Sequence, residues 1–279
     1  GFPSDPQNPS DYRPLTIGNT VERVIELFLH NRLAHWAEEN NLIPSTQAGF
    51  REHHSAEHQV YALMETITHE WRRGRDCYAV FIDFKKAYDS VHLGALWTVL
   101  DRMGLPANLL NLLKEWAGNR TTIITISDLR SEAFKADKGT PQGSVLSPLL
   151  FNLFISSLHT TLQTVAGWEG VRLTAGPGSS YSVTVRDLFY ADDLALLAKS
   201  LAQAQAALDA VWRWAREWGL ELGIGKDKTA AMLFRADAKE AVIPEQKLHA
   251  GEQEIPWVAR YKYLGYILQP NLKNDDIVD

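Results

Sequence analysis

Two adjacent aspartates interrupt an otherwise apolar run, Leu188-Phe189-Tyr190-Ala191-Asp192-Asp193-Leu194-Ala195-Leu196-Leu197. An unpaired charged carboxylate inside a hydrophobic core is costly, and its pKa shifts until the group becomes neutral. Neighbouring carboxylates also repel each other, so a cation is expected between them. The pattern therefore predicts strand, tight turn, strand, with the acids at the turn and a divalent metal in front of them. An exposed acidic hairpin tip is the alternative for this motif alone.

A second acidic position follows another apolar run. Residues 79–82 are hydrophobic and lead directly into Asp83, so this carboxylate is expected at the end of a buried strand, where a lone acid has no structural purpose. Asp89 and Ser90 come next and are good N-cap residues for a helix expected from about Leu93 to Met103. Asp83 is therefore a candidate site residue, and Asp89 is interpreted as a cap.

A third segment lies between these two acidic sites. Gly139-Thr140-Pro141-Gln142-Gly143 predicts a constrained turn, which leads into an apolar helix expected over roughly 149–162. The N-terminus of such a helix favours an anionic or polar ligand. Alone this is a weak signal, but its place between Asp83 and the aspartate pair strengthens it.

In this order the motifs resemble those of reverse transcriptases from non-LTR (LINE-like) retrotransposons, which are related to group II intron reverse transcriptases. The Asp83 segment resembles motif A, residues 139–143 motif B and residues 190–193 motif C. The other matching segments are Tyr12-Arg13-Pro14-Leu15-Thr16, Val21 to Leu33, Gln47-Ala48-Gly49-Phe50-Arg51, Trp218 to Thr229 (motif D) and Tyr261-Lys262-Tyr263-Leu264-Gly265 (motif E). The resemblance extends over nearly the whole chain.

The resemblance implies an α+β fold, a right-hand polymerase of fingers and palm with an antiparallel palm sheet backed by helices. The thumb is expected to be absent or nearly so. The expected division is 1–75 fingers, 76–118 palm with motif A, 119–140 fingers hairpin, 141–235 palm with motifs B, C and D, and 236–279 palm end with motif E and the start of the thumb connection. Periodicity independently predicts helices over 20–40, 56–73, 107–117 and 201–218, a hairpin over 121–136, and strands near 230–234 and 262–268.

By the same resemblance, a two-metal phosphoryl transfer is expected. Asp83 and Asp192 would be the bridging ligands of two Mg²⁺ ions, with Mn²⁺ as a possible substitute, and Asp193 would be a supporting acid. The backbone carbonyl of Phe84 is a further candidate ligand. Lys228 would protonate the leaving pyrophosphate.

Other residues are implied to contact the nucleotide or the primer. Tyr88 lies at the place of a steric gate that excludes a ribose 2′-hydroxyl, with a core tyrosine as the alternative. Arg51 is a candidate contact to the triphosphate because a guanidinium binds phosphate oxygens in a fork, although a solvated arginine is equally compatible with the sequence. The other candidates are Gln142 and Gly143 around the incoming nucleotide, and Tyr263, Leu264 and Gly265 along the primer.

One motif departs from the family. Motif D usually carries Asn three residues before the lysine, and this chain has Gly225 there. Together with Gly223, the substitution implies a looser loop around Lys228.

Composition agrees with an intracellular globular protein but not obviously with a nucleic-acid partner. The chain has 279 residues, a single cysteine and 45% hydrophobic residues. Its net charge of −6 lacks the basic footprint expected of a nucleic-acid binder. The missing charge is expected in further domains of a longer polyprotein, so this chain alone should bind template and primer weakly.

The expected partners are an RNA template, a DNA primer and deoxynucleoside triphosphates. No membrane partner is expected, because the most apolar stretch, 145–158, contains serines, Pro148 and Asn152. A eukaryotic retrotransposon would require nuclear access. Two alternatives stay open: an RNA-dependent RNA polymerase, which would be expected to carry Gly-Asp-Asp and a polar gate residue, and a catalytically silent RNA-binding scaffold.

Overall fold

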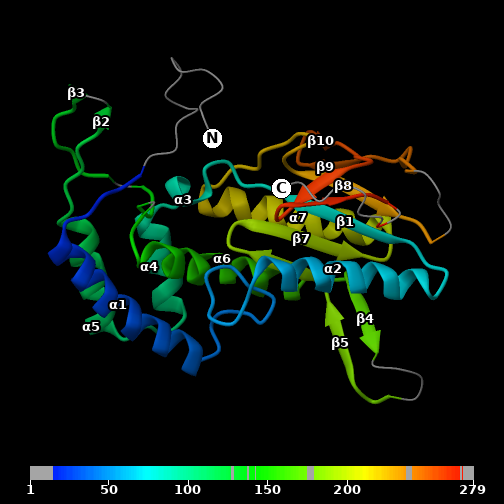
Figure 1. Ribbon diagram of the computed structural model, residues 1–279, viewed down its shortest axis with the longest axis horizontal. Helices are drawn as coiled ribbons and strands as arrows, with labels where there is room; N and C mark the ends of the chain where they lie inside the picture. Colours follow the sequence, from blue (N-terminus) through cyan, green and yellow to red (C-terminus); the bar gives the residue numbers. More distant parts are fainter. Residues whose placement is uncertain are drawn as a thin grey trace. The chain divides into compact units, whose positions relative to one another are not determined.

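The structure is a computed structural model that describes residues 15–126, 129–136, 138–141, 143–174, 179–236, 241–270 and 272 (Figure 1). The chain divides into two compact units. The first comprises Gly1–Asn41 and Tyr88–Phe151, and the second comprises Leu42–Ala87 and Asn152–Asp279. Gln142 and the Tyr12-Arg13-Pro14 segment lie outside the described residues.

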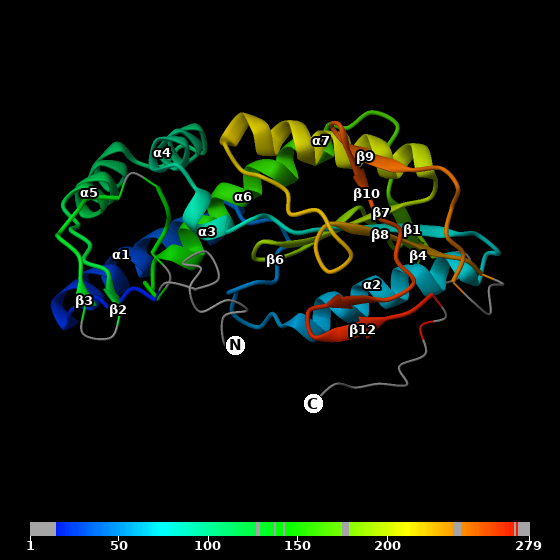
Figure 2. The same ribbon diagram turned by 90° about the horizontal axis from the view of Figure 1, so that it is seen from above.

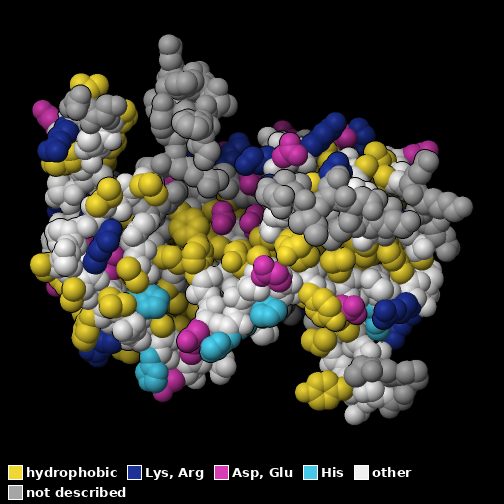
Figure 3. All heavy atoms as spheres, viewed as in Figure 1, with side chains coloured by type: hydrophobic (Ala, Val, Ile, Leu, Met, Phe, Trp, Pro, Cys, Tyr) yellow, Lys and Arg dark blue, Asp and Glu magenta, His cyan; other side chains and the backbone are white. Residues whose placement is uncertain are grey.

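The first unit is mainly helical. Its elements are α1 (Thr20–Glu39), α3 (Ala87–Ser90), α4 (Leu93–Arg102), α5 (Ala107–Gly118), β2 (Thr125–Ile126), β3 (Leu129–Arg130) and the start of α6 (Ser147–Gln163). The Asn19 side chain caps α1 by accepting a hydrogen bond from the Glu22 amide at 2.8 Å. Hydrophobic side chains are exposed along α1, including Val24 and Phe28 (Figure 3).

The second unit is built around a four-stranded antiparallel sheet of order β6-β7-β1-β8. Its elements are α2 (Ala56–Trp71), β1 (Cys77–Ile82), β4 (Val171–Thr174), β5 (Ser182–Val185), β6 (Asp187–Tyr190), β7 (Asp193–Ala198), α7 (Leu201–Trp218), β8 (Ala230–Phe234), β9 (Leu248–Ala250), β10 (Gln253–Ile255), β11 (Tyr261–Tyr263), β12 (Tyr266–Leu268) and the rest of α6. The expected α+β fold with an antiparallel sheet backed by helices is confirmed.

Both faces of the sheet are covered, which explains the unbroken apolar sequence of β1. Alternate residues Cys77, Ala79 and Phe81 pack with Val60 and Leu63 of α2 in one core cluster. The opposite face of the sheet packs against α7 (Figure 2). A strand buried on both faces needs apolar residues at successive positions rather than at every second one.

Most of the predicted elements are confirmed to within two residues, including the helices near 20–40, 56–73, 107–117 and 201–218. The predicted cap of α4 is wrong, because Asp89 and Ser90 belong to the short helix α3 and the N-cap residue is His92. In the described part of the chain, every helix is too short or too polar to cross a membrane.

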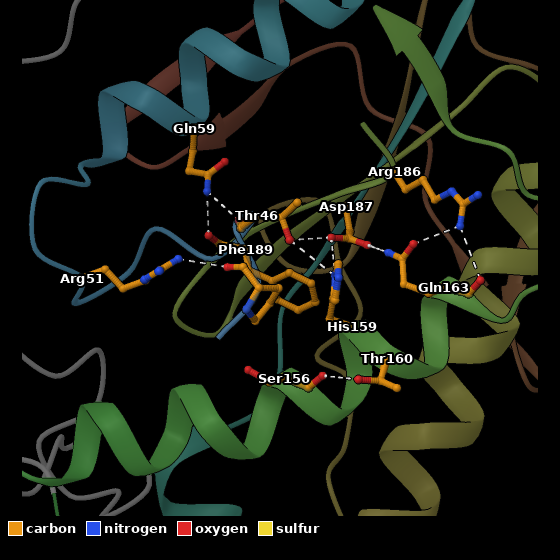
Figure 4. Close-up of polar contacts among 11 residues, drawn as sticks. Thr46, Arg51, Gln59, Ser156, His159, Thr160, Gln163, Arg186, Asp187 and Phe189 are labelled. Atoms are coloured by element: carbon orange, nitrogen blue, oxygen red, sulfur yellow. Dashed lines mark hydrogen bonds and ion pairs between the residues drawn. The ribbon is translucent and has the colours of Figure 1, made fainter. Parts of the chain in front are cut away.

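A buried carboxylate anchors the start of strand β6. Asp187 Oδ1 accepts hydrogen bonds from Thr46 Oγ1 at 2.8 Å and lies 2.9 Å from His159 Nδ1, while Oδ2 accepts from Gln163 Nε2 at 3.3 Å (Figure 4). The Asp187 side chain is fully buried. The network therefore satisfies a charge that burial would otherwise make costly.

Replacing this carboxylate is expected to destabilise the protein. Asp187→Ala removes a fully buried acceptor and leaves the part-buried donors on Thr46, His159 and Gln163 without it, so we expect the free energy of unfolding to fall by about 3 kcal/mol. Urea unfolding measures the change. Glu254→Ala is the matched control, because Glu254 pairs with Lys247 at 2.7 Å on the exposed surface, where an ion pair contributes little. Equal midpoints for the two variants would contradict this role of Asp187.

Candidate functional site

The ends of two neighbouring strands bring the predicted acids together. Ile82 pairs with Leu194 and Tyr190 pairs with Asp193, so Asp83 follows β1 beside the first residue of β7. Ala191 and Asp192 form the two-residue turn between β6 and β7. The expected strand, turn and strand are confirmed, with Asp192 in the turn and Asp193 at the first position of β7.

The electrostatics of Asp193 show that the three carboxylates influence one another. Desolvation, followed by the negative charges of Asp192 and Asp83, raises the pKa of Asp193 to about 6, and Lys228 opposes the shift. The Asp193 side chain still has substantial solvent access. The carboxylate is therefore partly desolvated by the sheet behind it while its open side can reach a ligand.

Lys228 supplies a positive charge next to Asp83. Its Nζ lies 3.2 Å from Asp83 Oδ1, and the lysine side chain is 58% exposed. Because the pair is partly exposed, its contribution to stability is small. Its consequence for the site is that a cation already faces the carboxylate at the end of β1.

The segment that carries Lys228 also holds the backbone of Asp83. Thr229 Oγ1 accepts a hydrogen bond from the Asp83 amide at 3.1 Å, and the Gly223 amide donates to the Asp83 carbonyl at 2.9 Å. A Cβ at position 223 would lie 2.5 Å from Asp83 Oδ2, so a larger residue there would displace the Asp83 carboxylate. A Cβ at Gly225 meets nothing closer than 3.7 Å, so that glycine has no comparable steric cause.

A pocket of about 220 Å³ opens beside Asp193. Strand β1 and the β11–β12 hairpin line it, with Phe81 stacked on Tyr261 at a centroid distance of 4.2 Å. Tyr261 donates a hydrogen bond from its hydroxyl to the Lys228 carbonyl at 2.8 Å. Burial and the nearby charge of Asp193 raise the pKa of Tyr261, so its hydroxyl stays protonated. The pocket thus lies between Asp193 at the start of β7 and the β11–β12 hairpin, which carries motif E.

The predicted primer residues form part of this pocket. Tyr263 is 3% exposed and packs in the core, while Leu264 and Gly265 form the turn of the hairpin. The Tyr263 hydroxyl has no hydrogen-bond partner among the described residues. Their contact with a primer stays a prediction.

Two other predicted residues, Arg51 and Phe84, also lie in the second unit. Arg51 Nη1 donates hydrogen bonds to the carbonyls of Pro44 at 3.1 Å and Gln47 at 3.2 Å, and so supports the loop before α2. Phe84 is buried, and its ring meets Trp214 edge to face at 6.1 Å. The triphosphate contact of Arg51 and the metal contact of the Phe84 carbonyl stay predictions.

Two predicted nucleotide-binding residues belong to the first unit. The Tyr88 ring stacks on Phe151 at a centroid distance of 4.4 Å, and the Tyr88 carbonyl accepts a hydrogen bond from the Thr140 amide at 2.9 Å. Gly143 lies in the turn before α6. Asp83, Asp192 and Asp193 lie in the second unit, together with Lys228 and the pocket.

The donor set fits a hard divalent ion that also takes ligands from its substrate. In the part of the chain that the structure describes, no three His, Cys, Asp or Glu side chains converge as a ready metal cage. Mg²⁺ commonly needs only one or two carboxylates and completes its octahedron with water and substrate phosphates. Asp83 and the Asp192-Asp193 pair offer such oxygens at one strand end.

Metal binding at this site should depend on pH. Ligand carboxylates must be deprotonated, so affinity for Mn²⁺ is expected to fall as the pH drops through about 6, where Asp193 takes up its proton. The same carboxyl stabilises the metal-free fold below its ordinary pKa of 3.8, and that contribution is lost as the pH rises through about 6.

Lys228→Met is expected to raise the pH at which half of the Mn²⁺ affinity is lost. The substitution removes the positive charge that lowers the pKa of Asp193. Mn²⁺ titrations on both sides of the midpoint measure the shift. Lys199→Met is the control, since Lys199 pairs with Glu169 at 2.8 Å beyond the other end of β7. An unchanged or lower midpoint in Lys228→Met would contradict the assignment.

Sequence reasoning did not predict the supporting role of several residues that shape the site. Thr229, Gly223 and Tyr261 support Asp83 and Lys228 through backbone contacts. Their only signal was their place within motifs D and E, because a threonine or glycine that binds a distant backbone carries no pattern of its own.

Comparisons with known proteins extend over nearly the whole chain. A family model for reverse transcriptase (RNA-dependent DNA polymerase) matches residues 4–268. A probable RNA-directed DNA polymerase from transposon BS of Drosophila melanogaster is 28% identical over 272 residues, which cover 95% of this chain and 28% of that protein. The retrovirus-related Pol polyprotein from type-2 retrotransposable element R2DM of the same species is 27% identical over 264 residues, which cover 93% of this chain and 24% of that protein.

The fold also matches a solved structure. Apo telomerase from Candida tropicalis, truncated from its C-terminal domain, aligns with a TM-score of 0.59 and 12% identity over 90% of this chain and 44% of that chain. This likeness shows the fold alone. The chain spans about a quarter of the length of the curated relatives named above. Because the family model covers almost every residue from the N-terminal segment to strand β12, the chain belongs to the reverse transcriptase (RNA-dependent DNA polymerase) family.

Proposed function

We propose that this chain catalyses RNA-templated DNA synthesis, adding deoxynucleotides to the 3′-hydroxyl of a DNA primer. The observation that carries the proposal is the placement of Asp83 beside Asp193, with Asp192 in the adjoining turn. Phosphoryl transfer builds negative charge on the transferred group and on the leaving pyrophosphate, so positioning and electrostatic stabilisation dominate its catalysis.

The carboxylates would hold two Mg²⁺ ions, with Mn²⁺ as a substitute. When bound, such ions activate the primer hydroxyl and neutralise charge on the attacking and leaving oxygens. Asp83 and Asp192 are assigned as the bridging ligands, with Asp193 in support and the Phe84 carbonyl as a further oxygen. The raised pKa of Asp193 supports this assignment, because burial and then the charges of Asp192 and Asp83 disfavour the ionised carboxylate, which a bound cation would stabilise.

Other side chains are assigned to the substrates. Lys228 is placed by its pair with Asp83 at the edge of the acidic group, where an ammonium can donate a proton to pyrophosphate. The β11–β12 turn beside Asp193 is assigned to the primer. Tyr88, Gln142, Gly143 and Arg51 are assigned to the incoming nucleotide. The lengths of the relatives support further domains in a longer protein, which would add affinity for RNA.

Primer extension on an annealed RNA template, with dNTPs compared against NTPs, tests the proposal. Extension with dNTPs in the presence of Mg²⁺, and its loss on adding EDTA, is the expected result. A preference for NTPs would replace the proposal with RNA-dependent RNA synthesis. Failure to extend with either nucleotide at saturating template and primer would favour a scaffold that binds RNA without catalysis.

A further inference from the structure

A buried glutamine clamps the turn that carries the aspartate pair. Gln47 is fully buried, and its side-chain amide contacts both backbone groups of Ala191, the residue immediately before Asp192. Gln47 Oε1 accepts from the Ala191 amide at 2.8 Å, and Gln47 Nε2 donates to the Ala191 carbonyl at 3.2 Å. The side chain thus replaces the pairing that a neighbouring strand would give this turn.

The backbone next to this glutamine closes the clamp. Gln47 Oε1 also accepts from the Gly49 amide at 2.8 Å, and Asn152 Nδ2 of α6 donates to the Gly49 carbonyl at 2.7 Å. A Cβ on Gly49 would collide with the Ala191 amide nitrogen. Only glycine at this position lets the loop approach the turn so closely.

The adjoining strand has separate support, which makes a matched comparison possible. Gln59 Nε2 donates to the carbonyls of Thr46 at 2.7 Å and Phe189 at 2.9 Å (Figure 4). The Ala48 amide donates to the same Phe189 carbonyl at 2.9 Å. Gln59 therefore holds strand β6, whereas Gln47 holds the turn after it.

The turn needs such a clamp for two reasons. Ala191 has a φ of 56°, a left-handed conformation that is unfavourable for a residue with a side chain. Repulsion among Asp83, Asp192 and Asp193 also favours a more open arrangement. Two hydrogen bonds from a side chain without rotational freedom oppose both tendencies.

We propose that Gln47 is a positioning residue, which holds the Ala191-Asp192 turn so that its carboxylates reach the geometry that metal-dependent transfer requires. This inference rests on the proposed function of the acids. It assigns no contact between Gln47 and substrate. Gln47 acts only through the backbone of Ala191.

Gln47→Met and Gln59→Met test the inference in the full chain. Both variants replace a buried amide with a side chain of similar size and remove two or more hydrogen bonds to the same region. For Gln47→Met we expect kcat for single-dNTP incorporation to fall by about 100-fold, because a small misplacement of catalytic groups has an effect of this size. The KM values for dNTP and for template-primer should stay within about threefold, because no substrate contact is lost.

Two further readouts do not depend on turnover. Hydrogen exchange of a peptide containing Ala191 should accelerate in Gln47→Met, and Mn²⁺ affinity should weaken by about 10-fold, as for other residues that orient metal ligands. Gln59→Met should keep kcat within about threefold and Mn²⁺ affinity unchanged. Equal losses of kcat in the two variants, in proportion to their losses of thermal stability, would overturn the inference.

Gly49→Ala is an independent test of the Ala191-Asp192 turn. It replaces Gln47→Met if that variant does not fold. Its Cβ displaces Ala191 without removing any polar group, so the same fall in kcat and in Mn²⁺ affinity is expected. Native kcat and exchange in Gly49→Ala would overturn the inference. If the wild-type chain extends no primer, the proposed function fails, while exchange and Mn²⁺ affinity still decide the role of Gln47.

Discussion

Asp192→Ala is expected to lower RNA-templated DNA synthesis by about 10³-fold or more, since several kcal/mol of transition-state stabilisation depend on its metal ligands. Asp192 lies in the turn between β6 and β7, next to Asp193, whose pKa it raises. Its removal relieves charge repulsion, so the thermal midpoint should stay equal or rise. Rapid-quench measurement of single-dNTP incorporation gives the rate.

Asp101→Ala is the matched control for this prediction. Asp101 is an exposed residue of α4, outside the acidic group, and its replacement should leave the rate unchanged. Asp83→Asn should reproduce the effect of Asp192→Ala, because both carboxylates are assigned to the same ions. An Asp192→Ala rate within tenfold of wild type would contradict the assignment of the site.

Tyr88→Ala is expected to raise the use of ribonucleotides relative to deoxynucleotides by about 100-fold. The aromatic ring is assigned to the space that a 2′-hydroxyl would need, and alanine leaves that space open. The stacking of Tyr88 on Phe151 fixes the ring, so it cannot turn aside at little cost. Competing incorporation of one NTP and its matching dNTP measures the ratio.

Tyr88→Phe separates the ring from the hydroxyl of the tyrosine. It keeps the stacking on Phe151 and should keep the wild-type ratio. A wild-type ratio in Tyr88→Ala as well would contradict the gate and favour a core tyrosine. Thermal midpoints of the two variants show how much the lost stacking contributes to stability.

The acidic residues at the strand ends could be predicted, because apolar runs indicate buried strands and a buried strand does not end in a carboxylate without a partner. The apolar sequence of β1 and the apolar residues around Asp192 and Asp193 predicted strands, and charged residues at their ends required a reason outside the core. The long helices could be predicted equally well, because helical periodicity over many residues is a strong signal. These predictions use only residues close together in the chain.

What could not be predicted depends on contacts between distant residues. Gln47 and Ala191 lie 144 residues apart, and Asp83 and Thr229 lie 146 apart. A glutamine gives no sign that its amide will replace a strand in front of a distant turn. The hairpins β4–β5 and β9–β10 were not predicted; their strands have three or four residues and belong to none of the motifs.

The α4 cap failed for a related reason. Asp89 and Ser90 have the right side chains, but the chain first forms α3 and only then enters α4 at His92. Propensity identifies residues that can cap a helix, and the tertiary path of the chain decides which residue occupies the position.

Mn²⁺ binding to a stalled complex tests the central claim, that the carboxylates of β1 and of the β6–β7 turn form one metal site. The complex contains RNA template, a dideoxy-terminated DNA primer and the next dNTP, and electron paramagnetic resonance measures the free ion. The account predicts that the wild-type complex binds Mn²⁺ beyond what the nucleotide binds alone, and that both Asp83→Asn and Asp192→Ala lose this binding. Wild-type Mn²⁺ binding in both variants would contradict it.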